Sequence, residues 1–229
     1  MKRYKTLLWV LAGSLALSGL VAATANATTT DQTDSRLEIT NQALIDLGDF
    51  VIVGRHSYNP DSSSVFIPLP ESKRNATVVF LDTPPTELIP ILNDHTKTKY
   101  EKLSLLQKLT EIEDSQRPMD DATWYTFGTP LGSAWSNSFY GGTLIGLDSS
   151  ARHQYAWKVT EGANQHACAQ GVGYYTGYNG RDFGIWRQWY GLSCGKEGGG
   201  SVPISNTYSR AEFKAKSTIV TTAATGLFR

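Results

Sequence analysis

Residues 174–190 read YYTGYNGRDFGIWRQWY, and this stretch decides the fold expected for the C-terminal half. Asn179-Gly180 is a dipeptide typical of tight turns between strands. The segment from residue 183 to residue 190 is rich in aromatic residues, which favours a β-strand. Successive side chains of a strand point to opposite faces. Trp186 and Trp189 are therefore expected on different faces, one inside the protein and the other outside.

The surrounding sequence extends this pattern over the C-terminal half. Residues 124–190 hold fifteen of the 25 aromatic residues, and sixteen of the 21 glycines lie between residues 128 and 200. Apolar and polar residues alternate over residues 155–160 and 211–222, as they do in half-buried strands. Gly198-Gly199-Gly200 is interpreted as a flexible linker between strands. Residues 121–229 are predicted to form an aromatic- and glycine-rich antiparallel β sandwich or barrel.

The preceding region, residues 28–120, contains few aromatic residues and is predicted to be mixed α/β. Apolar, β-rich runs predict strands at residues 50–53, 65–67 and 77–81. The clearest helix is expected over residues 97–114, where Tyr100 and several leucines share one stripe, and a shorter helix is expected over residues 37–47. The predicted fold class is thus α+β, with one clear amphipathic helix in the N-terminal half. One interpretation treats residues 28–120 as a regulatory or pro-region-like segment.

The first 27 residues have the three-part architecture of a secretory signal peptide. Residues 1–5 carry three positive charges, residues 6–21 form an apolar run, and Ala25-Asn26-Ala27 supplies small residues before a cleavage site. The alternative is an uncleaved anchor helix. The apolar run is interrupted by glycine and serine, whereas a spanning helix requires about 20 apolar residues. The sequence therefore predicts a secreted or periplasmic protein that begins at Thr28.

The charge balance of the exported chain excludes some partner classes. The leader takes three of the 21 basic residues with it, so 18 basic residues remain against 21 acidic residues, a net charge of −3. This balance does not steer the whole protein toward nucleic acid or an anionic membrane, which attract a concentrated basic face. After removal of the leader, no second apolar stretch approaches the length of a transmembrane segment.

The two cysteines, Cys168 and Cys194, both lie in the exported part of the chain. In an oxidising compartment, two cysteines 26 positions apart are most simply explained by a disulfide. The competing interpretation makes one of them a nucleophile that uses His166, close by in the sequence. A catalytic thiol has to stay reduced, which the presence of a partner cysteine disfavours.

The aromatic cluster suggests that the protein binds a ligand. Flat rings stack on sugar faces, and amide groups beside them orient a ligand through hydrogen bonds. The candidate ligand-binding residues are Tyr175, Tyr178, Asn179, Trp186 and Trp189. The alternative is that these rings form the core of the β domain. The favoured function is a secreted protein that binds carbohydrate or a cell surface, in an adhesion or toxin-like role, with an extracellular or envelope glycan as partner.

Two further hypotheses remain open. The first is a secreted hydrolase acting on polysaccharide, peptidoglycan or nucleic acid, whose candidate acid–base residues are His166, Glu161, Asp182 and Arg187. The second is a structural or inhibitory envelope protein. No spacing typical of zinc ligands and no nucleophile elbow occurs, so the sequence indicates no metal and no cofactor. It favours a binding protein over an enzyme.

Overall fold

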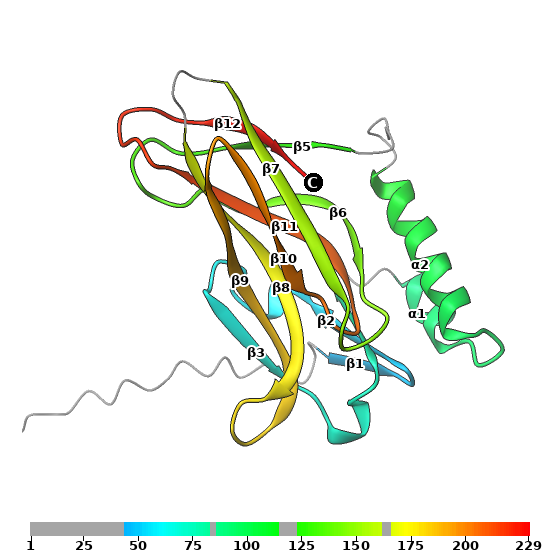
Figure 1. Ribbon diagram of the computed structural model, residues 1–229. Coiled ribbons are helices and arrows are strands. Elements are labelled where there is room, and N and C mark those ends of the chain that lie inside the picture. Colours follow the sequence, from blue (N-terminus) through cyan, green and yellow to red (C-terminus); the bar gives the residue numbers. More distant parts are fainter. Residues whose placement is uncertain (1–43, 83–85, 115–122, 162–165) are drawn as a thin grey trace, which may run out of the picture. The chain divides into compact units, whose positions relative to one another are not determined.

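The computed structural model describes residues 44–82, 86–114, 123–161 and 166–229 (Figure 1). The predicted signal peptide, residues 1–27, and the predicted boundary between residues 120 and 121 lie outside the described residues. The strands are β1 (Leu44–Leu47), β2 (Phe50–Gly54), β3 (Ser64–Pro68), β4 (Thr77–Leu81), β5 (Tyr125–Gly128), β6 (Phe139–Ile145), β7 (Arg152–Glu161), β8 (Ala167–Tyr178), β9 (Phe183–Gly195), β10 (Glu197–Pro203), β11 (Thr207–Ser217) and β12 (Thr225–Phe228). The helices are α1 (Leu88–Asn93) and α2 (Lys99–Asp114).

The largest sheet joins both halves of the chain. It has eight strands: seven follow the order β1-β2-β4-β11-β8-β9-β3, and the eighth, β6, pairs with β11. Most neighbours are antiparallel, but β4 lies parallel to both β2 and β11. The expectation of a purely antiparallel β unit confined to residues 121–229 is therefore wrong for this sheet, because β1 to β4 complete it. The protein is β-rich with few helices in its described part, and the composition change near residue 120 does not divide the sheet.

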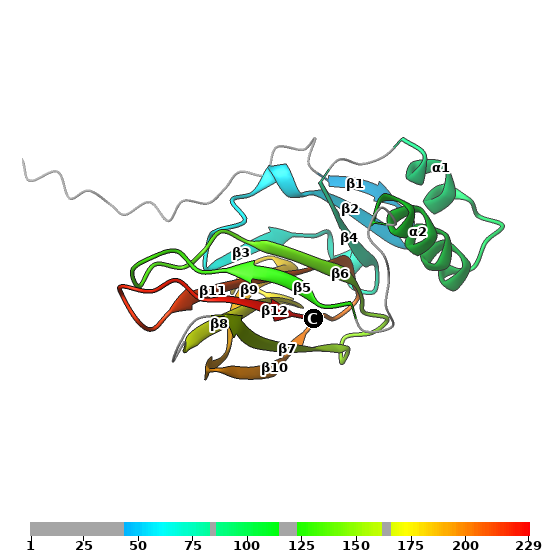
Figure 2. The same ribbon diagram turned by 90° about the horizontal axis from the view of Figure 1, so that it is seen from above.

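Strands β2 and β4 are buried along their whole length and largely apolar, because both of their faces are covered, as is usual for parallel pairs. On one face, Phe50 and Ile52 pack with leucines of α1 and α2. On the other face, Val51 and Val53 pack with residues of β3, β8 and β9. Figure 2 shows the two helices beside β1, β2 and β4. The large sheet thus curls around an apolar core on the face opposite the two helices.

A second sheet has the antiparallel order β10-β7-β12-β5. It packs on the large sheet through rings such as Trp157 and Phe228, which share a cluster with Phe213 of β11. Phe213 and Phe228 are stacked with their ring centroids 4.5 Å apart. The expectation that residues 198–200 form a linker is wrong, because these glycines lie within β10 and pair with residues 155–157 of β7.

The longest described pairing is the hairpin of β8 and β9, whose turn lies where the sequence predicted it. Tyr178 pairs with Phe183 at the last step before the turn, and Gly180 has a φ of +97°, a conformation that favours glycine. The side-chain Oδ1 of Asn179 accepts hydrogen bonds from the backbone N–H groups of Arg181 and Asp182, at 3.0 and 2.8 Å. The side chain of Asn179 therefore stabilises the turn.

The helix predictions are correct at one position and wrong at another. α2 begins at Lys99, two residues later than expected, and buries Leu103 and Leu106. Tyr100, which was expected on the packing stripe, is 69% exposed. The predicted helix over residues 37–47 is wrong at Leu44–Leu47, which form β1 and pair with β2; its earlier residues lie outside the described chain.

The predicted disulfide is confirmed. Cys168 of β8 and Cys194 of β9 face each other in the register of the hairpin, with their Cα atoms 4.0 Å apart, and their sulfur atoms are bonded. The bond joins strands that already pair along their whole length, so it reinforces an existing ladder.

Reduction of this disulfide is expected to lower the free energy of unfolding by up to about 3 kcal/mol, because the reduced unfolded chain regains the entropy of a loop of this size. Urea unfolding with and without a reducing agent, monitored by tryptophan fluorescence, measures the difference. Thiol labelling of the denatured, non-reduced protein is the control. Two labelled thiols per molecule would contradict the pairing.

Candidate functional site

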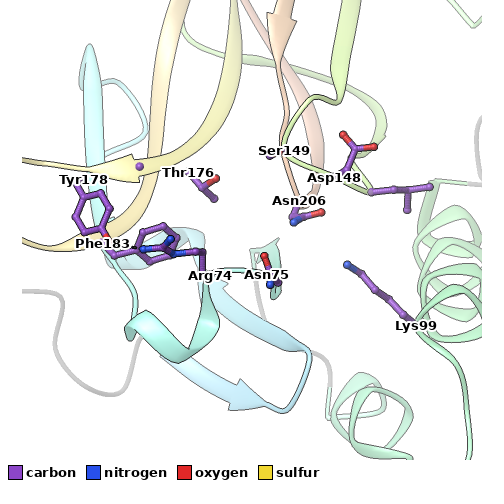
Figure 3. A pocket seen from close by; sticks show the side chains of 11 residues that line it. Arg74, Asn75, Lys99, Asp148, Ser149, Thr176, Tyr178, Phe183 and Asn206 are labelled. Carbon is purple, nitrogen blue, oxygen red and sulfur yellow. Dashed lines mark hydrogen bonds between the residues drawn. The ribbon is translucent and has the colours of Figure 1, made fainter.

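A pocket of about 580 Å³ lies at the end of the large sheet where β8 turns into β9 (Figure 3). We call it the Tyr178 pocket. Its walls come from five segments far apart in the sequence, and most of its side chains are polar. The lining residues are Arg74, Asn75, Lys99, Leu147, Asp148, Ser149, Thr176, Gly177, Tyr178, Phe183 and Asn206.

Two asparagines meet in this pocket because the strands that follow them are parallel. Asn75 lies two residues before β4, and Asn206 immediately precedes β11. Thr207 of β11 pairs with Val78 of β4, and the backbone N–H of Val78 donates to the carbonyl oxygen of Asn206 at 2.9 Å. The side-chain Oδ1 of Asn206 is buried and accepts no hydrogen bond from the described residues. It is an acceptor that a hydroxyl group of a ligand can satisfy.

Tyr178 is the exposed ring of the pocket and is held at its hydroxyl end. The ring is 54% exposed, and its OH donates to the carboxylate of Glu71 at 3.0 Å. The OH also accepts a hydrogen bond from Nη2 of Arg74 at 2.5 Å. The ring packs edge-to-face on Phe183, with centroids 5.6 Å apart. These contacts fix the orientation of Tyr178 before any ligand binds.

The charges around the pocket nearly cancel. Arg74 forms an ion pair with Glu71, whose negative charge raises the pKa of the guanidinium. Hydrogen bonds from the side chain and the backbone of Ser150 lower the pKa of Asp148, which stays ionised at neutral pH. Burial lowers the pKa of Lys99 from its usual value. In Figure 3 the Lys99 side chain extends from α2 toward the asparagines. The pocket is polar without being strongly charged.

Two other predicted ligand residues lie together, but on the opposite face of β8. Phe66 of β3, Trp186 of β9 and Tyr175 of β8 occupy directly opposite positions on three adjacent strands. The rings of Tyr175 and Trp186 are nearly parallel, with centroids 6.1 Å apart, and Phe66 lies 4.9 Å from Trp186. We call this row the aromatic strip. Since side chains alternate along a strand, Tyr175 cannot share a face with Tyr178 or Thr176 of the pocket.

Trp189 is a core residue. Its side chain is only 9% exposed, its Nε1 donates to the carbonyl oxygen of Pro60 at 3.3 Å, and Nζ of Lys214 lies 4.1 Å from the ring centroid. Trp186, on the other face of β9, is half-buried. The prediction that the two tryptophans lie on different faces is confirmed, with Trp189 as the inner one.

Arg187 is also buried and forms the centre of an internal polar cluster. Its Nη2 donates to Oε2 of Glu212 at 2.5 Å, and both side chains are almost completely buried. The hydroxyl of Tyr174 shares a hydrogen bond with Ser209 at 2.8 Å and donates to Glu212 at 3.3 Å. Ser209 and Glu212 reach the same side of β11 because a β-bulge interrupts the strand between them. In this arrangement Arg187 stabilises the fold.

The buried tyrosines predict a loss of stability at alkaline pH. Burial raises the pKa of Tyr174 to about 12, and burial raises the pKa of Tyr155 still further. An unfolded tyrosine ionises near pH 10, so stability is fully present below pH 10 and is lost as the pH rises toward the folded pKa. The raised pKa of each of these two tyrosines should lower the free energy of unfolding by roughly 1.4 kcal/mol at pH 11 relative to neutral pH. Urea unfolding between pH 8 and pH 11 tests this, and a constant free energy of unfolding over that range would contradict it.

The four candidate acid–base residues of the hydrolase hypothesis do not all lie at one place in the fold. His166 is exposed and precedes β8, and Glu161 is exposed at the end of β7. Asp182 follows the turn at the other end of the β8–β9 hairpin. A strand rises about 3.3 Å per residue, so the twelve residues of β8 separate His166 from Asp182 by tens of ångströms. The buried Arg187 lies between these two ends.

Tyr178 was predicted from the sequence, but its polar neighbours were not. These residues come from three separate loops, one with Arg74 and Asn75, one with Asp148 and one with Asn206, and no local motif marks them. Asn75 and Asn206 share one signal, a position just before a strand. That signal becomes useful only when β4 and β11 are known to be parallel neighbours.

Comparisons with known proteins identify no relative: no protein-family model, no curated protein and no solved structure matches the chain significantly. None of the helices within the described ranges combines the length and apolar character needed to cross a membrane. The description of function therefore rests on the geometry of the pocket and of the surrounding surface.

Proposed function

We propose that this protein acts outside the cytoplasm as a carbohydrate-binding protein and that the Tyr178 pocket is its ligand site. The observation that carries the proposal is the combination, in one pocket, of an exposed and oriented tyrosine ring with amide, hydroxyl and carboxylate groups. Sugars present apolar C–H faces and many hydroxyl groups, and such a pocket offers a partner to each. The partner is an extracellular or envelope glycan, bound in an adhesion or toxin-like role.

The polar groups complement hydroxyl groups in both directions. The carboxylate of Asp148 and the unpartnered Oδ1 of Asn206 accept hydrogen bonds, whereas the ammonium group of Lys99 donates them. The ion pair of Arg74 with Glu71 leaves the positive charge of Lys99 to balance the negative charge of Asp148. A pocket with this balance is suited to a neutral, polyhydroxylated ligand.

The disulfide supports an extracytoplasmic location. Disulfides such as Cys168–Cys194 persist in oxidising compartments, and the expected signal peptide leads to one of them. Mass spectrometry of exported material tests the leader directly, since the proposal requires an N-terminus at Thr28. Exported protein that retains residues 1–27 would contradict cleavage.

The pocket is tested by glycan-array screening followed by titration calorimetry with the best glycan. Tyr178→Ala is expected to weaken binding by roughly 1–3 kcal/mol, the range found when an aromatic ring that stacks on a flat ligand is removed. The melting temperature should change little, because the ring is half exposed. Tyr178→Phe keeps the ring, loses its hydrogen bonds to Glu71 and Arg74, and should weaken binding less.

Trp186→Ala is the matched control, because it removes a half-buried ring from the aromatic strip on the other face of β8. It should leave the affinity unchanged. Loss of binding in Trp186→Ala with normal binding in Tyr178→Ala would contradict the proposed location. Failure of the wild-type protein to bind any glycan would contradict the proposed ligand class.

A further inference from the structure

Two loops lie side by side at one end of the two sheets, where β5 and β11 end (Figures 1 and 2). They are residues 129–138, between β5 and β6, and residues 218–224, between β11 and β12. The N–H of Thr129 donates to the carbonyl oxygen of Ala224, and the N–H of Gly132 donates to that of Val220, both at 2.8 Å. These bonds continue the pairing of β5 with β12 beyond the sheet and hold the loops together. We call the pair of loops the apolar tip.

The tip exposes aliphatic side chains that the fold does not use. Leu131 is 69% exposed and Val220 is 64% exposed, and the hydrogen bond from Gly132 to Val220 makes them neighbours. Neither loop contains an aspartate or a glutamate. Acidic side chains would repel a negatively charged surface, and these loops have none.

Behind the two aliphatic side chains lie an aromatic residue of the tip itself, Trp135, and two lysines of β11. Nζ of Lys214 lies 5.5 Å and Nζ of Lys216 lies 4.9 Å from the ring centroid of Trp135. Trp135 is held over β11 because the backbone N–H of the next residue, Ser136, donates to the carbonyl oxygen of Ala215 at 2.9 Å. The order from the end of the loops inward is thus aliphatic side chains, then a tryptophan with two lysines.

We propose that the apolar tip docks on the surface of an anionic lipid bilayer. Aliphatic side chains enter the boundary between headgroups and acyl chains, tryptophan occupies the headgroup level, and lysines contact anionic headgroups. Leu131 with Val220, Trp135, and Lys216 provide these three layers in the required order, whereas Lys214 is held over the buried ring of Trp189. The exported chain has an expected net charge of −3, but this charge does not oppose the docking. Salt screens electrostatic interactions, so the bilayer interacts only with protein charges within about 10 Å of its surface.

The proposed docking is independent of glycan binding. Asn206 of the Tyr178 pocket precedes the first residue of β11, and the tip loop of residues 218–224 follows its last residue. The eleven residues of β11 therefore separate the two sites. A protein bound to a bilayer by the tip would keep its pocket away from that bilayer, so each site is testable with the other intact.

The test is co-sedimentation of the disulfide-bonded protein with vesicles of phosphatidylcholine alone or of phosphatidylcholine with phosphatidylglycerol. The wild-type protein should bind the anionic vesicles and bind neutral vesicles less. The double variant Leu131→Ser/Val220→Ser should partition roughly tenfold more weakly, since it removes the apolar contact. Lys216→Gln should reduce binding to anionic vesicles about fivefold, and added salt should reduce it further in the wild type.

Matched variants on α2 provide the controls. Tyr100 is as exposed as Leu131, and Lys108 is an exposed lysine, so Tyr100→Ser and Lys108→Gln should bind vesicles as the wild type does. Thermal melting confirms that each variant is folded. Three results would overturn the proposal: no sedimentation of the wild type with anionic vesicles, unchanged binding of Leu131→Ser/Val220→Ser, or an equal loss of binding in Tyr100→Ser.

Discussion

Replacement of Trp189 by alanine is expected to lower the free energy of unfolding by about 3–5 kcal/mol, the range for truncation of a large buried ring. The ring is almost completely buried and packs with the residues of the core inside the curled sheet. It also touches two cationic side chains, with Cζ of Arg187 at 5.4 Å and Nζ of Lys214 at 4.1 Å from the ring centroid. Alanine would leave a cavity and remove both contacts.

Trp186→Ala is the comparison, because it removes the same ring three residues away from the other face of β9, where the ring is half-buried. Its cost should be clearly smaller. Urea unfolding followed by far-ultraviolet circular dichroism measures both variants. Equal costs, or a larger cost for Trp186→Ala, would contradict the assignment of Trp189 to the core.

Replacement of Glu212 by glutamine is expected to cost about 3–5 kcal/mol, because it leaves the guanidinium of Arg187 buried without its counter-charge. Burial acts to lower the pKa of Arg187, but the neighbouring Glu212 acts to raise it. The pKa is raised overall, so the guanidinium stays charged. Arg187 has no exposed area, so water cannot replace the lost counter-charge of Glu212.

The double variant Arg187→Met/Glu212→Leu distinguishes the loss of a partner from the loss of a favourable pair. Because both charges disappear, this variant should recover much of the stability lost in Glu212→Gln. Both variants are compared by chemical denaturation at neutral pH. A Glu212→Gln protein as stable as the wild type would show that the buried pair does not have the predicted role.

The strands were predictable wherever the side-chain pattern carried the information. The runs at residues 50–53 and 77–81 are apolar and β-branched, and they form β2 and β4. Their parallel pairing with each other and with β11 was not predictable, because it depends on which distant strand pairs with each edge. The assumption of two separate halves failed for the same reason. A change of composition near residue 120 reports where aromatic residues are used, whereas the sheet is assembled by pairing across that point.

The glycine-rich segment shows why composition alone does not predict secondary structure. Gly198-Gly199-Gly200 has the composition of a flexible linker, yet it forms part of β10. A Cβ atom on Gly198 would lie 1.9 Å from Oγ of Ser193, and one on Gly199 would lie 2.3 Å from the carbonyl oxygen of Tyr155. The glycines are needed because neighbouring strands approach closely. That reason is visible only in the folded protein.

The candidate site was predictable only in part. Alternation along β9 correctly separated Trp186 from Trp189, and Tyr178, which was expected to bind a ligand, lines the pocket. The polar residues that surround Tyr178 come from the loops before β4, β7 and β11 and from the start of α2, and their meeting is a consequence of topology. Asn179, which was expected to bind a ligand, uses its side chain to hold the turn.

The most direct test of the central claim is to map a bound glycan by nuclear magnetic resonance. A glycan selected on the array is titrated into ¹⁵N-labelled protein, and changes in backbone amide shifts are assigned to residues. We predict that the largest changes occur at Ser149, Thr176, Gly177 and Asn206, which line the Tyr178 pocket. Largest changes at Phe66, Tyr175 and Trp186 of the aromatic strip, with the pocket unaffected, would contradict the account.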